Sequence, residues 1–310
     1  MRLRHIGNRN RRQLLLNRIV IARIGYKDGI MIQDIGNKKF NNQYNPSAVA
    51  TDEDYVFVFG EGIYIKLLDN DIAVPTFREL GVSQDDVRYL FSIDEGQFFI
   101  LKNDWLEQNG KEFALPDGYS FESMRALRMC TPMCMAGMTA NHLANWYRDN
   151  RYCGRCGKPT VHDDKLRMVK CPDCGNMIFP RINPAVIIGL RNGDSLMTSK
   201  YANRPQSNGR ALLAGFCEIG ETAEETVVRE VMEEVGLKAT NVQYYGSQPW
   251  GFAGNISLGY FCDLEGDDAI TLDEDELASA EFMKRDELPE PNNMVSLTAT
   301  MIEEFRRGNW

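Results

Sequence analysis

The chain has 310 residues, enough for two compact domains and a small additional module, and 43% hydrophobic with 25% charged residues is typical of folded globular proteins. The net charge of -9 at pH 7 argues against tight, sequence-independent binding of nucleic acid, because such binding depends on a basic surface. No run of about 18 apolar residues and no cleavable secretory signal occurs, so we expect a cytoplasmic protein without a membrane span.

The first 30 residues differ in composition from the rest of the chain. Seven arginines and no acidic residue lie among the first 23 positions. A basic, acid-poor segment is typical of organelle-targeting peptides, although this one contains no serine. Because the composition becomes ordinary at Met31, the alternative is that residues 1–30 are a basic N-terminal extension that the fold does not need.

Residues 31–150 predict an N-terminal mixed α/β domain. Short β-type runs alternate with turn-rich connections, at 55–59, 62–66 and 97–101. From about Ser120 we expect a helical stretch, in which Met138, Leu143 and Trp146 are spaced to form one buried face. No motif in this part indicates a chemical activity.

Residues 151–178 contain two CxxC pairs separated by 14 residues, each followed by glycine: Cys153, Cys156, Cys171 and Cys174. This spacing is close to that of four-cysteine zinc sites, so we predict a zinc ribbon. Disulfides or a thioredoxin-like redox pair are the alternatives, but disulfides do not persist in a reducing cytoplasm and a redox CxxC normally occurs singly. Four thiolates leave no open coordination position, so the Zn²⁺ would be structural.

Residues 179–310 predict further strands, at 184–189, 195–199, 211–214, 244–245, 258–262 and 280–283, and a closing amphipathic helix over 295–306. Between the third and fourth of these strands, Thr222 and Glu225 have the spacing of a capping box, which predicts a helix from Thr222 to about Val235.

Carboxylates are concentrated around this helix, with an arginine among them: Glu221, Arg229, Glu230, Glu233 and Glu234. Three of the glutamates are spaced i, i+3 and i+4, which places them on one helix face. Like charges this close repel one another, so the cluster predicts divalent cations, which oxygen ligands suit. A solvated acidic helix face is the alternative, but it does not account for Arg229 or for Gly215, Gly220 and Gly236.

The motif runs from Gly215 through five residues to Glu221, then through seven residues to the segment 229–237, and it resembles the signature of the Nudix hydrolases at every fixed position. The resemblance implies an α/β/α sandwich in which Mg²⁺ or Mn²⁺ is held against a diphosphate that water attacks. It also implies that Arg229 orients a glutamate of the loop, Glu221; a helical pair of Arg229 with Glu225 is the generic alternative.

A zinc ribbon before such a domain, together with Ser247-Gln-Pro-Trp250 after the motif, resembles the NADH pyrophosphatase family. This resemblance implies a homodimeric, metal-dependent pyrophosphohydrolase that cleaves NAD(H)-like dinucleotides to NMN(H) and AMP, and that also removes NAD caps from RNA. Alternatives are a Nudix hydrolase with broader specificity, such as for ADP-ribose, a nucleotide sensor that does not cleave, and a zinc-ribbon protein that binds nucleic acid.

Positions can be carried over from this family one by one. For Mg²⁺ or Mn²⁺ the resemblance implies Glu230, Glu234, the carbonyl of Ala214 and Glu276, with Glu233 as ligand or base. A solvated acidic loop is the alternative for Glu276. For the substrate it implies a set of ten residues: Arg125, Phe179, Phe216, Gln248, Pro249, Trp250, Gly251, Phe252, Asn255 and Thr298.

Two features leave this substrate set open. Core packing is the alternative for Phe179, Phe216 and Trp250, and solvation is the alternative for Arg125. Two prolines of the family motif are also absent after Trp250, where Gly251 and Gly254 are expected to loosen the segment and broaden the choice of dinucleotide.

Overall fold

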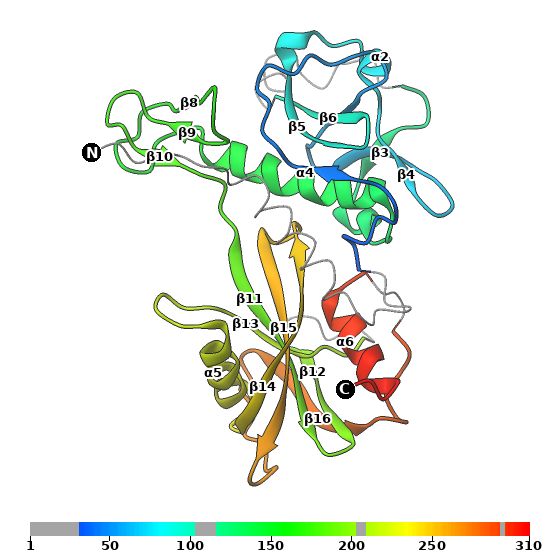
Figure 1. The fold of residues 1–310 in the computed structure, drawn as a ribbon, viewed down its shortest axis with the longest axis vertical. Coiled ribbons are helices and arrows are strands. Elements are labelled where there is room, and N and C mark those ends of the chain that lie inside the picture. The colour runs from blue at the N-terminus through cyan, green and yellow to red at the C-terminus, as the bar shows by residue number, and fades with distance from the viewer. Residues whose placement is uncertain (1–30, 103–115, 203–208, 292–294) are drawn as a thin grey trace, which may run out of the picture.

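The structure is a computed structural model that describes residues 31–102, 116–202, 209–291 and 295–310. The predicted basic extension, residues 1–30, lies outside the described residues. Three parts follow one another along the chain: an N-terminal domain that ends in a long helix, a small three-stranded ribbon, and a C-terminal domain built on a six-stranded sheet (Figure 1). No helix in the described ranges is long and apolar enough to cross a bilayer.

The N-terminal domain contains two small sheets around a core of aromatic and aliphatic side chains. The first sheet has the strand order β1 (Phe40–Asn41), β5 (Val87–Ile93), β6 (Gly96–Leu101), β2 (Tyr55–Phe57). The second has the order β4 (Ile72–Ala73), β3 (Ile63–Leu67), β7 (Ser120–Glu122). Short helical turns connect the strands: α2 (Phe77–Leu80), η1 (Gln84–Asp86) and η2 (Met124–Leu127). The three predicted strands are confirmed within about two residues.

Helix α4 (Pro132–Asp149) begins later than the sequence predicted. The expectation of a helix from about Ser120 is wrong, because residues 120–122 pair with β3 as strand β7. The helix starts where Pro132 occupies its first turn and the Thr131 hydroxyl accepts a hydrogen bond from the Cys134 amide at 3.1 Å. The predicted buried face is confirmed, since Met138, Leu143 and Trp146 are all buried in the core of the N-terminal domain.

The ribbon has three antiparallel strands in the order β10 (Met177–Ile178), β9 (Val169–Lys170), β8 (Val161–His162). It is attached to the N-terminal domain, whose core includes the buried Val169. The Arg167 guanidinium donates to the Leu90 carbonyl at 2.5 Å and lies over the Tyr44 ring at 5.3 Å. Arg167 therefore packs the ribbon against its neighbour and is not one of its freely exposed cations.

The C-terminal sheet has the strand order β14 (Lys238–Trp250), β15 (Asn255–Glu265), β11 (Asn183–Asn192), β12 (Ser195–Tyr201), β16 (Leu277–Lys284), and β13 (Leu213–Phe216) also pairs with β11. Only the β11–β15 pair is parallel among the pairs of this sheet. The predicted strand at 211–214 lies two residues later, because Ala214 and Gly215 pair with β11 whereas Ala211 only bridges to Ser199.

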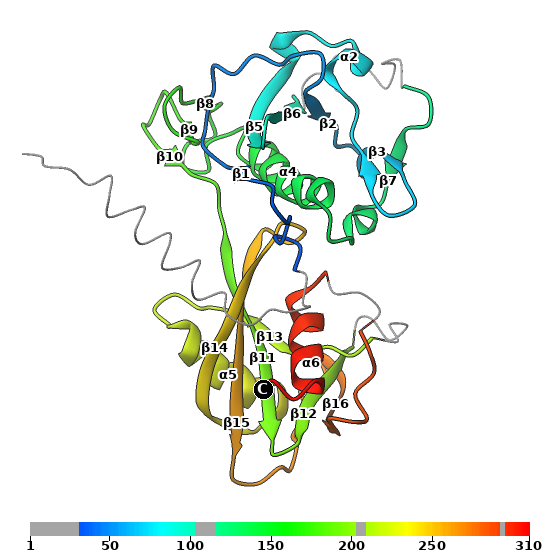
Figure 2. The same cartoon turned by 45° about the vertical axis from the view of Figure 1, so that its right-hand side comes forward.

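Two helices cover the two faces of this sheet, α5 (Ala223–Val235) and α6 (Leu297–Arg306) (Figure 2). Neighbouring strand residues point to opposite faces, so Met197 and Leu213 join the core under α5, while Leu196 and Leu212 join the core under α6. The predicted α/β/α sandwich, preceded by a ribbon and a mixed N-terminal domain, is confirmed.

Candidate active site

Helix α5 is fixed at both ends, and this sets the direction of its glutamates. The Thr222 hydroxyl accepts from the Glu225 amide at 3.2 Å, and the Glu225 carboxylate accepts from the Thr222 amide at 2.8 Å, which confirms the predicted capping box. Gly236 ends the helix with φ +68°, a conformation that favours glycine. Glu225 thus serves the cap, and the pair with Arg229 that the sequence left open does not occur among the described ion pairs.

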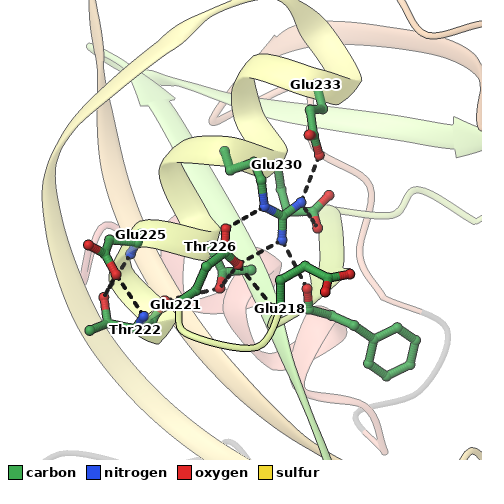
Figure 3. Close-up of polar contacts among 9 residues, drawn as sticks. Glu218, Glu221, Thr222, Glu225, Thr226, Glu230 and Glu233 are labelled. Carbon is green, nitrogen blue, oxygen red and sulfur yellow. Dashed lines mark hydrogen bonds and ion pairs between the residues drawn. The ribbon is translucent and has the colours of Figure 1, made fainter.

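The Arg229 guanidinium bonds the carboxylates of Glu221, Glu230 and Glu233, which are labelled in Figure 3. Its Nε and Nη2 donate to the two oxygens of Glu221 at 2.6 and 3.0 Å. Its Nη1 donates to Glu230 at 2.8 Å and to Glu233 at 2.7 Å, and its Nη2 also donates to the Phe216 carbonyl at 3.0 Å. The predicted contact of Arg229 with Glu221 is confirmed, and its bidentate form fixes both side chains.

The contact with Arg229 also sets the charge of Glu221. Hydrogen bonds from Arg229, and then from the Glu218 amide, lower the pKa of Glu221 to about 2. The same bonds raise the pKa of Arg229 above its ordinary value. Glu221 is therefore an anion throughout the neutral range, which suits a group that orients the loop.

Glu230 and Glu234 point from α5 into the sheet and are 8% and 2% exposed. The Glu230 carboxylate lies so close to Gly215 that a Cβ there would be 1.9 Å from its Oε1, so a side chain at position 215 would displace this carboxylate. Burial raises the pKa of Glu230, against the opposing effect of Arg229. Burial also raises the pKa of Glu234 to about 8, and the charges of Glu230 and Glu276 add to this shift.

The buried carboxylates fit a divalent cation in chemistry. The Glu234 Oε1 accepts from the Ala214 amide at 3.4 Å, whereas its Oε2 is buried and has no hydrogen-bond partner. A buried, unsatisfied carboxylate oxygen is costly, and a hard cation satisfies it. Glu276 lies close enough to raise the pKa of both Glu230 and Glu234. Among the described residues, however, only the cysteines gather three or more ligand atoms within 4.8 Å, so the full carboxylate set stays a prediction.

The four cysteines of the ribbon form a compact thiol cluster. The Sγ atoms of Cys153 and Cys174 are 3.6 Å apart, and those of Cys156 and Cys171 are 3.5 Å apart. Tetrahedral Zn–S bonds of about 2.3 Å place sulfurs about 3.8 Å apart, so the cluster fits Zn²⁺. Each pair is followed by a glycine with positive φ, Gly157 at +72° and Gly175 at +71°. The amide of each glycine donates a hydrogen bond to the carbonyl of the first cysteine of its own pair. The two knuckles thus have the same local geometry.

Two of the predicted substrate residues line one hollow of about 250 Å³, namely Trp250 at the end of β14 and Thr298 in the first turn of α6. Arg128, Lys200 and Tyr201 also line this hollow. The backbone beside this hollow is joined to the segment of Glu276, because Tyr201 is followed by Ala202, whose amide donates to the Glu276 carbonyl at 2.9 Å.

Gln248, also predicted to bind substrate, is fully buried and engaged within the protein. Its Nε2 donates to the Val295 carbonyl at 2.8 Å, and its Oε1 accepts from the Leu297 amide at 2.7 Å. Both contacts hold the start of α6 beside β14. Asn255 is 6% exposed and donates to Ser257 at 3.2 Å, while its Oδ1 is buried without a partner.

The hairpin between Trp250 and Asn255 is held against α4. A Cβ on the buried Gly251 would lie 2.2 Å from the Met138 carbonyl, so glycine is required there for close approach. The Gly251 carbonyl accepts from the buried Asn141 at 2.9 Å. The Phe252 ring packs edge-on against Trp250 at 5.0 Å. The expectation that this glycine loosens the segment is therefore wrong; it permits a tight contact between domains.

The remaining predicted substrate residues lie at the surface. Phe179 and Phe216 are 51% and 55% exposed, so the core-packing alternative does not hold for either ring. Pro249 is exposed beside the hairpin. Arg125 is exposed in η2 and does not line the hollow, whereas Arg128 does.

Sequence analysis missed three residues at this end of the sheet: Arg128, Asn141 and Lys200. Asn141 lies on the buried face of α4, where a polar residue among apolar ones indicates an internal hydrogen bond. Arg128 and Lys200 carried no comparable signal, because their meeting depends on how the two domains pack.

Comparison with known proteins gives matches in both C-terminal parts of the chain. The model of the NADH pyrophosphatase zinc ribbon domain matches residues 148–179, and that of the NUDIX domain matches residues 181–305. The chain is 31% identical over 239 residues to the NAD-capped RNA hydrolase NudC of Photobacterium profundum, which covers 77% of this chain and 86% of that protein.

Other matches are shorter. The chain is 36% identical over 162 residues to the NAD-capped RNA hydrolase NudC of Pectobacterium atrosepticum, and this alignment covers 52% of the chain but only 62% of that relative. A crystal structure of a NUDIX hydrolase from Nitrosomonas europaea is 18% identical with a TM-score of 0.42, covering 51% of this chain and 92% of that one.

Proposed function

The chain belongs to the Nudix hydrolases that carry an NADH pyrophosphatase zinc ribbon, and we propose that it is a metal-dependent diphosphatase of NAD(H)-like dinucleotides. Water attacks one phosphorus of the diphosphate, the bridging P–O bond breaks, and the products are NMN(H) and AMP. The observation that carries this proposal is the bidentate contact of Arg229 with Glu221. Beside it lies the buried Glu230, whose carboxylate fills the space where a side chain at Gly215 would begin.

We assign the cation ligands to Glu230, Glu234 and Glu276, with the Ala214 carbonyl beside them. The partnerless Oε2 of Glu234 and the coupling of its pKa to Glu230 and Glu276 support this set. Mg²⁺ or Mn²⁺ bound here would act as a Lewis acid toward the diphosphate and make the attacking water more acidic.

Two further side chains of the motif have distinct proposed roles. Arg229 holds the Glu221 loop and keeps the Phe216 carbonyl in place. Glu233 is the most exposed carboxylate that Arg229 contacts, at 57% side-chain exposure. It is therefore the one that bulk water reaches most easily, which supports a role as general base or outer ligand.

The nucleosides of the substrate are proposed to bind at the end of the sheet nearest the N-terminal domain. Trp250 and Thr298 line the hollow there, and the half-exposed rings of Phe179 and Phe216 offer faces on which a base can stack. Phe216 adjoins the carboxylates, because its own carbonyl accepts from Arg229. The other predicted substrate residues stay proposed, either as contacts of the substrate or as residues that hold those contacts in place: Arg125, Gln248, Pro249, Gly251, Phe252 and Asn255.

The names of the relatives support a second substrate, because proteins named NAD-capped RNA hydrolase match this chain. We therefore include the NAD cap of RNA among the proposed substrates. A homodimer in the cytoplasm is proposed with it, since the family resemblance implies pockets that two chains share.

The direct test is incubation of the purified protein with a dinucleotide panel and either Mg²⁺ or Mn²⁺, with products identified by mass. NADH and NAD⁺ are expected to give NMN(H) and AMP, and Glu234→Gln should remove this activity without unfolding the protein. Turnover of the variant close to the wild-type rate would contradict the assignment. Binding of ADP-ribose or NADH without products from any dinucleotide would instead identify a sensor.

A further inference from the structure

The hollow beside Trp250 is basic, although the protein as a whole carries a net charge of -9. Arg128, Lys200 and Arg210 line it, and no carboxylate is among the described residues of its lining. Arg210 is paired with Glu281 at 2.6 Å. Within the described ranges neither Arg128 nor Lys200 has a carboxylate partner, although Arg128 lies over the Phe252 ring at 6.0 Å. Two cations therefore line this space, and the described part of the chain supplies no carboxylate partner for either of them.

These cations lie on the α6 face of the sheet. Lys200 is four residues from Leu196 along β12, and Leu196 packs into the core under α6. Glu230 and Glu234 belong to α5, which covers the opposite face. A diphosphate held by those carboxylates is consequently not the anion that Lys200 and Arg128 face.

We propose that Arg128 and Lys200 form a second anion subsite, which binds a phosphate group esterified to a ribose of the nucleotide, outside the diphosphate that is cleaved. This inference rests on the proposed function. Arginine and lysine are the side chains that bind phosphate most effectively. The N-terminus of α6 adds partial positive charge, since Ser296 caps it and Thr298 lines the same hollow. Trp250 offers a ring for the adjoining nucleoside.

The subsite joins two domains, because Arg128 follows η2 in the N-terminal domain while Lys200 belongs to β12. Two substrates contain the required group. A phosphorylated dinucleotide such as NADPH carries a ribose phosphomonoester, and NAD-capped RNA carries a phosphodiester at the first ribose of the chain. The chemistry recognised is the same in both.

The test measures kcat/KM for three substrates with full-length protein and Mg²⁺. They are NADH, NADPH and a dinucleotide cap in which the adenosine 3′ oxygen of NAD is joined to one further nucleotide. The variants are Lys200→Gln and Arg128→Gln, and Lys238→Gln is the matched control because Lys238 is exposed at the far end of β14. We expect Lys200→Gln and Arg128→Gln each to lower the kcat/KM for a phosphate-bearing substrate, relative to the kcat/KM for NADH, by about ten- to a hundredfold. Loss of a charge-assisted hydrogen bond has an effect of this size. The control ratio should not change.

The outcomes separate the two sources. If kcat/KM relative to NADH falls for NADPH, the group bound is the phosphomonoester. If it falls only for the extended cap, the group bound is the RNA phosphodiester. Either result supports the subsite. Equal losses on all three substrates, or no loss on any, would overturn it.

A binding measurement keeps the inference independent of turnover. By calorimetry, the wild type should bind adenosine 2′,5′-bisphosphate or adenosine 3′,5′-bisphosphate more tightly than AMP, and Lys200→Gln should remove that preference. If the wild type hydrolyses none of the dinucleotides, the proposed function fails, while this preference still decides the subsite. Equal affinity of the wild type for all three nucleotides would overturn it.

Discussion

The Glu230 carboxylate occupies the space where a side chain at Gly215 would begin, with its Oε1 1.9 Å from an ideal Cβ. Because the obstructing atoms are the movable end of a side chain, Gly215→Ala should displace Glu230 and leave the β13 backbone in place. We expect turnover to fall by about a hundredfold, since a displacement of about 1 Å at a reacting centre has that effect. The unfolding temperature should change little.

Gly154→Ala is the matched control for this prediction, because nothing lies within 4 Å of a Cβ at Gly154. It should leave both turnover and the unfolding temperature unchanged. Full activity of Gly215→Ala would show that the position of Glu230 is not critical.

Glu234 predicts an unusual pH dependence of stability in metal-free protein. Its pKa is about 8 in the fold against an ordinary 4.5, so the folded state holds the proton more tightly than the unfolded state does. Stability should therefore be full below pH 4.5 and fall as the pH rises toward 8. Glu234→Gln should raise the unfolding temperature of metal-free protein at pH 8 by several degrees, and the difference should vanish below pH 4.5.

A divalent cation should reverse the order of the two unfolding temperatures at pH 8, so that the wild type becomes more stable than Glu234→Gln. Mg²⁺ or Mn²⁺ should raise the unfolding temperature of the wild type, because binding to the folded state alone stabilises it, and should leave Glu234→Gln unchanged. An equal shift of both proteins would remove Glu234 from the proposed ligands.

Glu221 predicts the opposite pH dependence, since its bond to Arg229 lowers its pKa to about 2. The stability that this pair contributes should be complete above pH 4.5 and be lost as the pH falls toward 2. Glu221→Gln should therefore unfold at a lower temperature than the wild type at pH 7, and the two curves should converge in acid. Thermal scans from pH 2 to pH 7 provide the measurement.

Arg229→Lys tests the geometry of the same pair. Lysine keeps the charge but cannot reproduce a bidentate guanidinium, so we expect turnover to fall by about a hundredfold or more. Zinc content should stay the same, which separates this effect from damage to the ribbon. Wild-type turnover in Arg229→Lys would mean that the charge alone is required.

Much of this architecture could be predicted from sequence, because its signals are local. The capping box of Thr222 and Glu225, the contact of Arg229 with Glu221 and the cysteine knuckles each lie within a short segment with fixed spacing. The late start of α4 was missed because residues 120–122 form a strand only through pairing with β3, which lies far away in sequence.

Contacts near the substrate site have the same origin. The expectation that Gly251 loosens its segment is wrong, because the Met138 carbonyl lies against it. The bonds of the Gln248 amide to Val295 and Leu297 gave no signal in the sequence either, and its contact with substrate stays a prediction. Arg128 and Lys200 meet only because two domains pack. Contacts between distant segments leave no periodic pattern in a sequence.

The four-cysteine cluster predicts one Zn²⁺ per chain that stabilises the ribbon without taking part in turnover. Cys171→Ser should lose the metal by elemental analysis and unfold at a lower temperature, because the short strands β8 to β10 contain only two residues each. Cys262→Ser is the control, since Cys262 is buried in the sheet far from the ribbon and should keep zinc. Equal zinc content in both variants would contradict the assignment.

Gln248 distinguishes support of the site from contact with substrate. Replacement by Leu would remove the bonds that the Gln248 amide makes to the Val295 carbonyl and the Leu297 amide, and loss of a hydrogen-bond partner at a buried group costs about 1–3 kcal/mol. We therefore expect Gln248→Leu to lower the unfolding temperature and to raise KM, because the first turn of α6 carries Thr298 of the hollow. Gln243→Leu, at an exposed site on the same strand, should change neither quantity. A higher KM with unchanged stability in Gln248→Leu would instead place this side chain on the substrate.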